Sequence, residues 1–147
     1  MGRVRRGRWV PLIPTTFRWP ILALWTLEPI ARGIDYVTGD LPGTTSSLTF
    51  VETAMPLQMW GVLFLAAGVT VAAGFLGRWP NITIAGLHVM GCTYAALAIG
   101  LIVKCVERGG DGFRTPMMFA IFAATCWSAA LGYLNQTRNE RALKAAS

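Results

Sequence analysis

Long apolar runs without a formal charge dominate the pattern of hydrophobic and polar positions along this chain. Residues 53–77, 79–103 and 115–137 contain no Asp, Glu, Lys or Arg, and each run exceeds twenty residues. About 20 helical residues cross the roughly 30 Å hydrocarbon core of a bilayer. The pattern therefore predicts membrane-spanning helices over about 57–77, 82–103 and 116–134.

A further apolar segment, residues 19–38, is interrupted by charge. Glu28, Arg32 and Asp35 lie at i, i+4 and i+7, so a helix places them along one face. A central charge costs about 2.5–3.5 kcal/mol on insertion, against about 0.3–0.6 kcal/mol gained per Leu, Ile or Val. A span here therefore requires packing against other helices. Two other arrangements fit the same residues: a helix lying at the membrane interface, or a cleaved signal peptide with Ala31 and Gly33 at the −3 and −1 positions.

A faint repeat of 60 residues favours four spans over three. The tripeptide Arg-Trp-Pro occurs at 18–20 and again at 78–80, and Pro56 is matched by Pro116. A parallel repeat of two helical hairpins places both tripeptides on the same face of the membrane, which requires four spans. We expect an all-α polytopic membrane protein, a bundle of four transmembrane helices over residues 19–137, with three helices as the alternative.

Composition and charge agree with a membrane location. The chain is 54% apolar and only 14% charged, with a mean hydropathy of +0.49, whereas soluble domains are about a quarter charged. The net charge of +6 arises mainly from residues 1–18 and 138–147. Flanking cations of this kind set orientation and contact anionic lipid. We expect two basic tails on the cytoplasmic side of the cytoplasmic (inner) membrane, the lipid bilayer as a partner, and no nucleic-acid partner.

The charged residues of segment 19–38 are the candidate site. Arg32 lies one helical turn from both Glu28 and Asp35, so we expect it to be their shared partner. His88 aligns with Glu28 in the repeat, since each lies ten residues past its Arg. A buried carboxylate–imidazole pair is a reasonable proton or ion relay, and a histidine hydrogen-bonded to a neighbouring helix is the alternative. The predicted intramembrane charge cluster is therefore Glu28, Arg32, Asp35 and His88.

Small residues recur at i+4 spacing in two of the predicted spans. They are Ala120, Ala124, Ser128 and Gly132 in the last span, and Cys92, Ala96 and Gly100 in the span before it. Such ladders let two helix backbones approach closely, and they serve packing within one chain and assembly between chains equally well. We expect these positions to be helix-packing surfaces, with a homo-oligomer or another membrane protein as the partner of any that face outward.

The chain carries no recognisable catalytic motif. It has no Walker loop, no nucleotide-binding glycine pattern, no Gly-x-Ser-x-Gly elbow and no zinc signature. Its three cysteines are scattered without a CxxC spacing, and there is one histidine. We expect no enzyme activity, no metal and no cofactor.

With 147 residues, basic tails, several short spans and no catalytic signature, the chain resembles the small holin-like membrane proteins encoded by phages and by bacteria with GC-rich genomes. The resemblance implies a function by self-assembly in the cytoplasmic membrane, forming or regulating a lesion or channel. Two alternatives remain open. One is a non-enzymatic accessory or scaffold subunit that docks another membrane protein, and the other is a small ion or proton channel built around Glu28 and His88.

Overall fold

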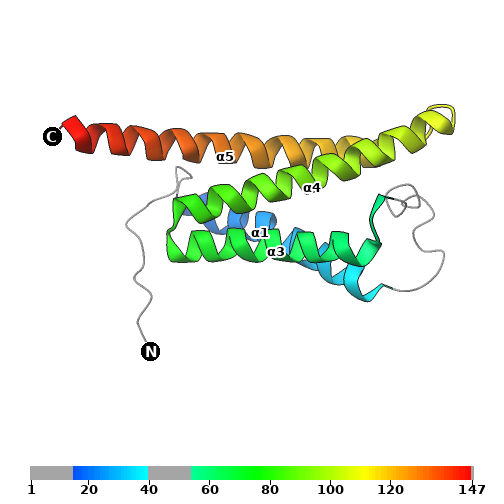
Figure 1. The fold of residues 1–147 in the computed structure, drawn as a ribbon, viewed down its shortest axis with the longest axis horizontal. Coiled ribbons are helices and arrows are strands. Elements are labelled where there is room, and N and C mark those ends of the chain that lie inside the picture. Colours follow the sequence, from blue (N-terminus) through cyan, green and yellow to red (C-terminus); the bar gives the residue numbers. More distant parts are fainter. Residues whose placement is uncertain (1–14, 40–53, 147) are drawn as a thin grey trace.

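The computed structural model describes residues 15–39 and 54–146, and these ranges fold into helices joined by short turns (Figure 1). Most of the basic tail expected at 1–18 lies outside the described residues. The helices are α1 (Thr15–Thr38), α3 (Leu57–Gly77), α4 (Pro80–Glu107) and α5 (Arg114–Ala146). The prediction of an all-α fold is confirmed for the described part of the chain.

Three of these helices are long and apolar enough to cross a membrane: α3, α4 and the Arg114–Leu143 part of α5. Helix α3 coincides with the predicted span 57–77, and the predicted spans 82–103 and 116–134 lie inside α4 and α5. Helix α1 is not among the three, because Glu28, Arg32 and Asp35 interrupt its apolar sequence. Within the described residues, three candidate membrane spans are therefore present, and a bundle of four spanning helices stays a prediction.

Each helix packs against the next one along the chain, α1 on α3, α3 on α4 and α4 on α5. Trp25 stacks on Phe75, and Tyr36 lies edge-on to Phe64, so α1 and α3 run antiparallel. The start of α1 therefore lies near the end of α3, where α4 begins, and α5 returns to that same end of the molecule (Figure 1). The two Arg-Trp-Pro tripeptides, one near the start of α1 and one at the start of α4, lie at the same end, as the repeat predicts.

The turn between α3 and α4 is tight because of its local sequence. Arg78 adopts the left-handed conformation, and the N–H of Trp79 donates to the carbonyl of Gly74 at 2.8 Å, which closes α3. Pro80 then begins α4, at a position where its missing N–H is not needed. A Cβ on Gly74 would lie 2.6 Å from the backbone nitrogen of Thr83, so only glycine allows the two helices to meet this closely.

The core between the helices is built largely from aromatic side chains. Phe64 of α3 and Tyr94 of α4 are fully buried at its centre, and Phe119 and Tyr133 of α5 join them. Large apolar side chains also cover the outward surfaces, among them Val62, Val69, Ile99, Ile121 and Leu131. Extensive exposed apolar surface of this kind marks contact with a membrane or with other proteins.

Helix α5 continues well past the predicted end of its span. Its 33 residues extend about 50 Å at 1.5 Å per residue, more than a hydrocarbon core of roughly 30 Å requires. The continuation projects beyond the start of α4 (Figure 1), and its Arg138, Glu140 and Arg141 are exposed. Most of the basic tail expected at 138–147, residues 138–146, forms the final turns of this helix.

Candidate functional site

The inner face of α1 carries the polar groups of the candidate site. Glu28, Arg32 and Tyr36 follow each other at i, i+4 and i+8, a spacing that places them in one row along a helix. The small or compact residues Pro29 and Gly33 lie next to this row and are buried. They bring α1 close to α3, because a Cβ on Gly33 would lie 2.8 Å from the carbonyl oxygen of Gly61. The row therefore faces into the space that α3, α4 and α5 surround.

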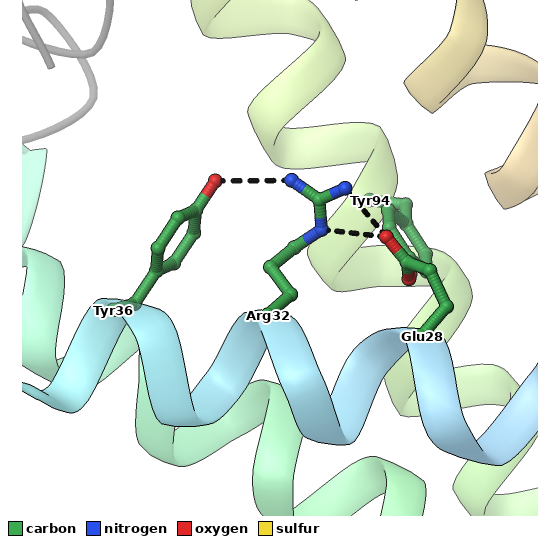
Figure 2. Close-up of polar contacts among 4 residues, drawn as sticks. All are labelled: Glu28, Arg32, Tyr36 and Tyr94. Carbon is green, nitrogen blue, oxygen red and sulfur yellow. Dashed lines mark hydrogen bonds and ion pairs between the residues drawn. The ribbon is translucent and has the colours of Figure 1, made fainter. Parts of the chain in front are cut away.

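Glu28 and Arg32 form an ion pair within α1 (Figure 2). The Nε and Nη2 groups of Arg32 both donate to Oε1 of Glu28, the former at 2.8 Å, and Nη1 donates to the hydroxyl oxygen of Tyr36 at 3.3 Å. The hydroxyl of Tyr94, on α4, donates to Oε2 of Glu28. Each oxygen of the carboxylate thus has its own donor, and the two donors come from different helices.

Aromatic rings surround the guanidinium group. Its Cζ atom lies 4.7 Å from the ring centroid of Phe119 on α5 and 6.0 Å from that of Phe64 on α3. A cation above an aromatic face is stabilised by about 0.5–2 kcal/mol, more as water is excluded. Tyr94 packs in turn against Phe64, Phe119 and Phe122, at centroid distances of 4.9, 5.9 and 5.4 Å. Residues of all four helices therefore contact the ion pair, which fixes α1 against the other three.

The structure corrects the expected role of Asp35. Asp35 is exposed, and the ion pairs of the described residues do not join it to Arg32. At about 100° of rotation per residue, position 35 is turned about 100° from position 36, to the outer side of α1. Tyr36 occupies the inner position, and its hydroxyl oxygen accepts a hydrogen bond from Nη1 of Arg32. The prediction of a Glu28–Arg32 pair is confirmed, and the prediction that Arg32 is shared with Asp35 is wrong.

His88 also lies away from the ion pair. It is exposed on α4, in an open groove of about 410 Å³ whose lining includes Trp60, Leu63 and Cys92. The partner that α4 supplies to Glu28 is Tyr94, six residues further along. The Glu28–His88 pair, one of the two arrangements considered from the sequence, is therefore absent. Sequence reasoning missed Tyr94, although a tyrosine in the middle of an apolar span is a usable signal, because its buried hydroxyl needs a hydrogen-bond partner.

The predicted ladder of α5 lies mostly beside the surface on which α5 packs within the chain. The buried core residues of α5 are Phe119, Ala123, Cys126, Ala130 and Tyr133, and Ala120 is a ladder residue that packs against this core. The ladder lies beside them: Ala124 and Ser128 are exposed, Ala120 and Gly132 are half-buried, and a Cβ on Gly132 would meet nothing within 4 Å.

The ladder of α4 divides in the same way, since Cys92 and Ala96 are exposed and only Gly100 is buried. The close helix contacts within the chain occur elsewhere. A Cβ on Gly61 would lie 2.8 Å from the carbonyl oxygen of Gly33, and one on Gly91 would lie 2.6 Å from Nε1 of Trp127. The ladders that face outward are therefore surfaces available to another helix.

Metal-ligating side chains do not gather at this site. Within the part of the chain that the structure describes, no three His, Cys, Asp or Glu residues lie close enough together to hold an ion. The hydrogen bonds of Glu28 also occupy both of its oxygens.

No family model, curated protein or solved structure matches this chain. Within its described residues, the chain is a small helical protein with three helices long and apolar enough to cross a membrane, and the ion pair of the charged helix α1 contacts all of them.

Proposed function

We propose that this chain is a small integral membrane protein of the cytoplasmic membrane that acts by self-assembly, as holin-like or pore-forming proteins do. The observation that carries the proposal is the outward position of the small-residue ladder of α5. Ala120, Ala124, Ser128 and Gly132 extend over about 18 Å of the helix, at 1.5 Å per residue. A Cβ on Gly132 would meet nothing within 4 Å in the described chain, so this part of the ladder has room for another helix. Helices associate in lipid through such small-residue surfaces, because their backbones can approach closely there.

The ion pair favours assembly over transport as the basis of function. Glu28 and Arg32 have their partners within the chain, in Tyr94 and Tyr36, so the pair serves to hold α1 in place. A relay through Glu28 and His88 has no support from this geometry, because His88 faces outward on α4. An accessory subunit that docks a different membrane protein would use the same face of α5, and the experiments below separate it from self-assembly.

Replacing Ala124 with isoleucine is expected to abolish cross-linked oligomers of the full chain in membranes. The added side chain separates two backbones that pack through this face, whereas a lipid-facing position tolerates it. Chemical cross-linking of membranes measures the effect, with Ala73→Ile, at an exposed alanine of α3 outside both ladders, as the matched control. If Ala124→Ile forms oligomers at the wild-type level, the chain does not assemble through this face of α5.

The same two variants distinguish self-assembly from an accessory role. Controlled expression of the wild-type chain in a bacterium is expected to dissipate the membrane potential, Ala73→Ile should do the same, and Ala124→Ile should not. A potential that stays intact with the wild-type chain, although oligomers form, would contradict the pore-forming function and favour the accessory subunit.

We also propose that both tails lie in the cytoplasm. The start of α1 and the end of α5 lie at one end of the molecule (Figure 1), and the residues that flank the helices there are basic. A fluorescent protein that matures only in the cytoplasm, fused after Ser147, is expected to fluoresce, and a periplasmic phosphatase at the same position is expected to be inactive. Phosphatase activity from that fusion would contradict this orientation.

A further inference from the structure

A groove between α3 and α4 opens on the side of α4 that is turned away from the aromatic core. Its volume is about 410 Å³, and its lining includes His88, Cys92 and Ala96 of α4. These three residues lie at i, i+4 and i+8, so they form one row along the helix. Position 92 is turned about 200° from Tyr94, which is buried in the core, at about 100° of rotation per residue. The row therefore forms the α4 wall of an outward-facing groove.

His88 has no hydrogen-bond partner among the described residues, although it lies within the predicted span 82–103. It lies about 12 Å along α4 from Pro80, at 1.5 Å per residue. The hydroxyl of Thr93, which also lines the groove, donates within α4 to the carbonyl of Val89 at 2.9 Å. An imidazole without a partner is costly in hydrocarbon, where polar side chains pair with other protein groups. The groove therefore calls for an occupant that brings a hydrogen-bonding group to His88.

Ser128, in the outward ladder of α5, also has no hydrogen-bond partner within the part of the chain that the structure describes. The hydroxyls of Thr26, Thr70 and Thr125, by contrast, each donate to a carbonyl of the preceding turn, at 2.7, 2.6 and 2.8 Å. A hydroxyl can donate to one nitrogen of a neutral imidazole or accept from the other. Ser128 therefore offers the kind of group that His88 lacks.

These two polar side chains lie at a similar depth. Helices α4 and α5 run side by side and antiparallel (Figure 1), and a Cβ on Gly91 would lie 2.6 Å from Nε1 of Trp127. His88 lies three residues before Gly91, and Ser128 lies one residue after Trp127, so the two levels differ by about 3 Å, at 1.5 Å per residue. Copies of the chain inserted in the same orientation share this depth. The hydroxyl of one copy is therefore level with the imidazole of another.

The small residues of the two rows match in the same register. Both rows repeat every four residues, so Ala124 lies level with Cys92 when Ser128 lies level with His88. Position 128 is turned about 200° from Cys126, which is buried in the core, so the α5 ladder points away from the core as the groove does. Two copies packed back to back, related by a two-fold axis along the membrane normal, therefore bring each ladder against the groove of the other copy.

We propose that the α3–α4 groove is the docking site for the α5 ladder of a second copy, with a hydrogen bond between His88 of each copy and Ser128 of the other. This docking rests on the proposed self-assembly, for which it names the surface that receives α5. Small residues along both rows let the two backbones approach closely enough for the hydrogen bond to form. A lipid acyl chain in the groove would leave both polar groups without a partner in hydrocarbon, which favours a second copy as the occupant.

Disulfide formation between two differently tagged chains in one membrane tests this contact, with Cys105→Ala and Cys126→Ala in every chain. One chain keeps Cys92, and the other carries Cys92→Ala/Ala124→Cys. Oxidation with copper phenanthroline is expected to join the two chains at least fivefold more than either joins to itself, because a disulfide requires Cβ atoms about 3.5–4.5 Å apart. Val62→Cys in place of Ala124→Cys, at an exposed position of α3 that does not line the groove, is the matched control and should give no disulfide.

The disulfide pattern separates the docking site from self-assembly itself. If the Ala124→Cys chain joins to itself as strongly as to the Cys92 chain, the α5 ladders face each other and the proposal is overturned. If no disulfide forms while the wild-type chain still gives chemically cross-linked oligomers, self-assembly survives and the docking site is overturned. A wild-type chain without oligomers would overturn both.

A second measurement, in chains that keep all three cysteines, tests the hydrogen bond. Association in lipid vesicles is measured by energy transfer between fluorophores at the C-terminus. His88→Ala and Ser128→Ala should each weaken association at least threefold, and the double variant should weaken it no further, because both changes remove the same hydrogen bond. Thr125→Val removes an exposed hydroxyl of α5 that bonds within its own helix, and it should leave association unchanged. Effects that multiply in the double variant would show that His88 and Ser128 do not pair, which would overturn the proposal.

Discussion

Replacing Arg32 with alanine is expected to destabilise the folded protein by up to about 3–5 kcal/mol, the range found when one partner of a fully buried ion pair is removed, since the two side chains here are 22% and 24% exposed. The substitution leaves the carboxylate of Glu28 with only the hydroxyl of Tyr94, in a space lined by Phe64 and Phe119. It also removes the contacts between the guanidinium group and those rings. Unfolding of the purified protein by SDS in mixed micelles, together with the yield of membrane-integrated chain, measures the effect.

Two further variants show whether the loss arises from an unpaired charge. Glu28→Gln/Arg32→Gln replaces both charges with amides and should cost less than Arg32→Ala, because no ion is left without a partner. Asp35→Asn should change stability by less than about 0.5 kcal/mol, since Asp35 is exposed and away from the pair. If Arg32→Ala and the double variant integrate and unfold alike, α1 lies at the membrane interface, where exposed ion pairs contribute little.

The positions of the spans were predictable because they depend only on where charged residues occur along the sequence. Uncharged runs of more than twenty residues located α3, α4 and α5, and the charges of α1 marked it as different. The extension of α5 was not predicted, because Arg138, Glu140 and Arg141 end the apolar run. Those residue types nevertheless favour helix, and α5 continues through them to Ala146. Hydropathy therefore located the spans but did not set the helix ends.

The site was predictable within one helix and not between helices. The i, i+4 spacing identified the Glu28–Arg32 pair directly. The repeat placed His88 at a depth similar to that of Glu28, but contact also depends on rotation about the helix axis. Six residues separate His88 from Tyr94, a rotation of about 240°, so the two side chains point in different directions. Tyr94 faces inward and donates a hydrogen bond to Glu28, whereas His88 faces outward.

The helix contacts illustrate the same limit. A ladder of small residues shows that one face of a helix is flat, but it does not show what lies against that face. A close approach between α1 and α3 uses one glycine from each helix, Gly33 and Gly61, and neither belongs to an i+4 ladder predicted from the sequence. A contact formed by single residues of two helices leaves no periodic pattern in either one.

Replacing Gly61 with alanine is therefore expected to separate α1 from α3 and to destabilise the protein by about 1–3 kcal/mol, the usual effect of overpacking a well-filled contact. The new Cβ would lie 2.8 Å from the carbonyl oxygen of Gly33 and 2.9 Å from the backbone nitrogen of Val37. Both are backbone atoms, so relief requires a shift of the whole helix, which also draws Arg32 away from Phe64 and Phe119.

For the stability of the monomer in mixed micelles, Gly132→Ala is the matched control, because it makes the same chemical change in a helix where the added Cβ meets nothing within 4 Å in its own chain. Alanine favours helix over glycine by up to about 1 kcal/mol, so this variant should be as stable as the wild type or slightly more so. Gly61→Ala gains the same helix propensity. A lower stability of Gly61→Ala than of the wild type therefore measures the effect of the contact between α1 and α3. The measurement is the free energy of unfolding by SDS in mixed micelles, for both variants and the wild type. A Gly61→Ala protein as stable as Gly132→Ala would show that α1 does not pack on α3 at this point. The contact between α1 and α3 would then not hold the ion pair among the other helices.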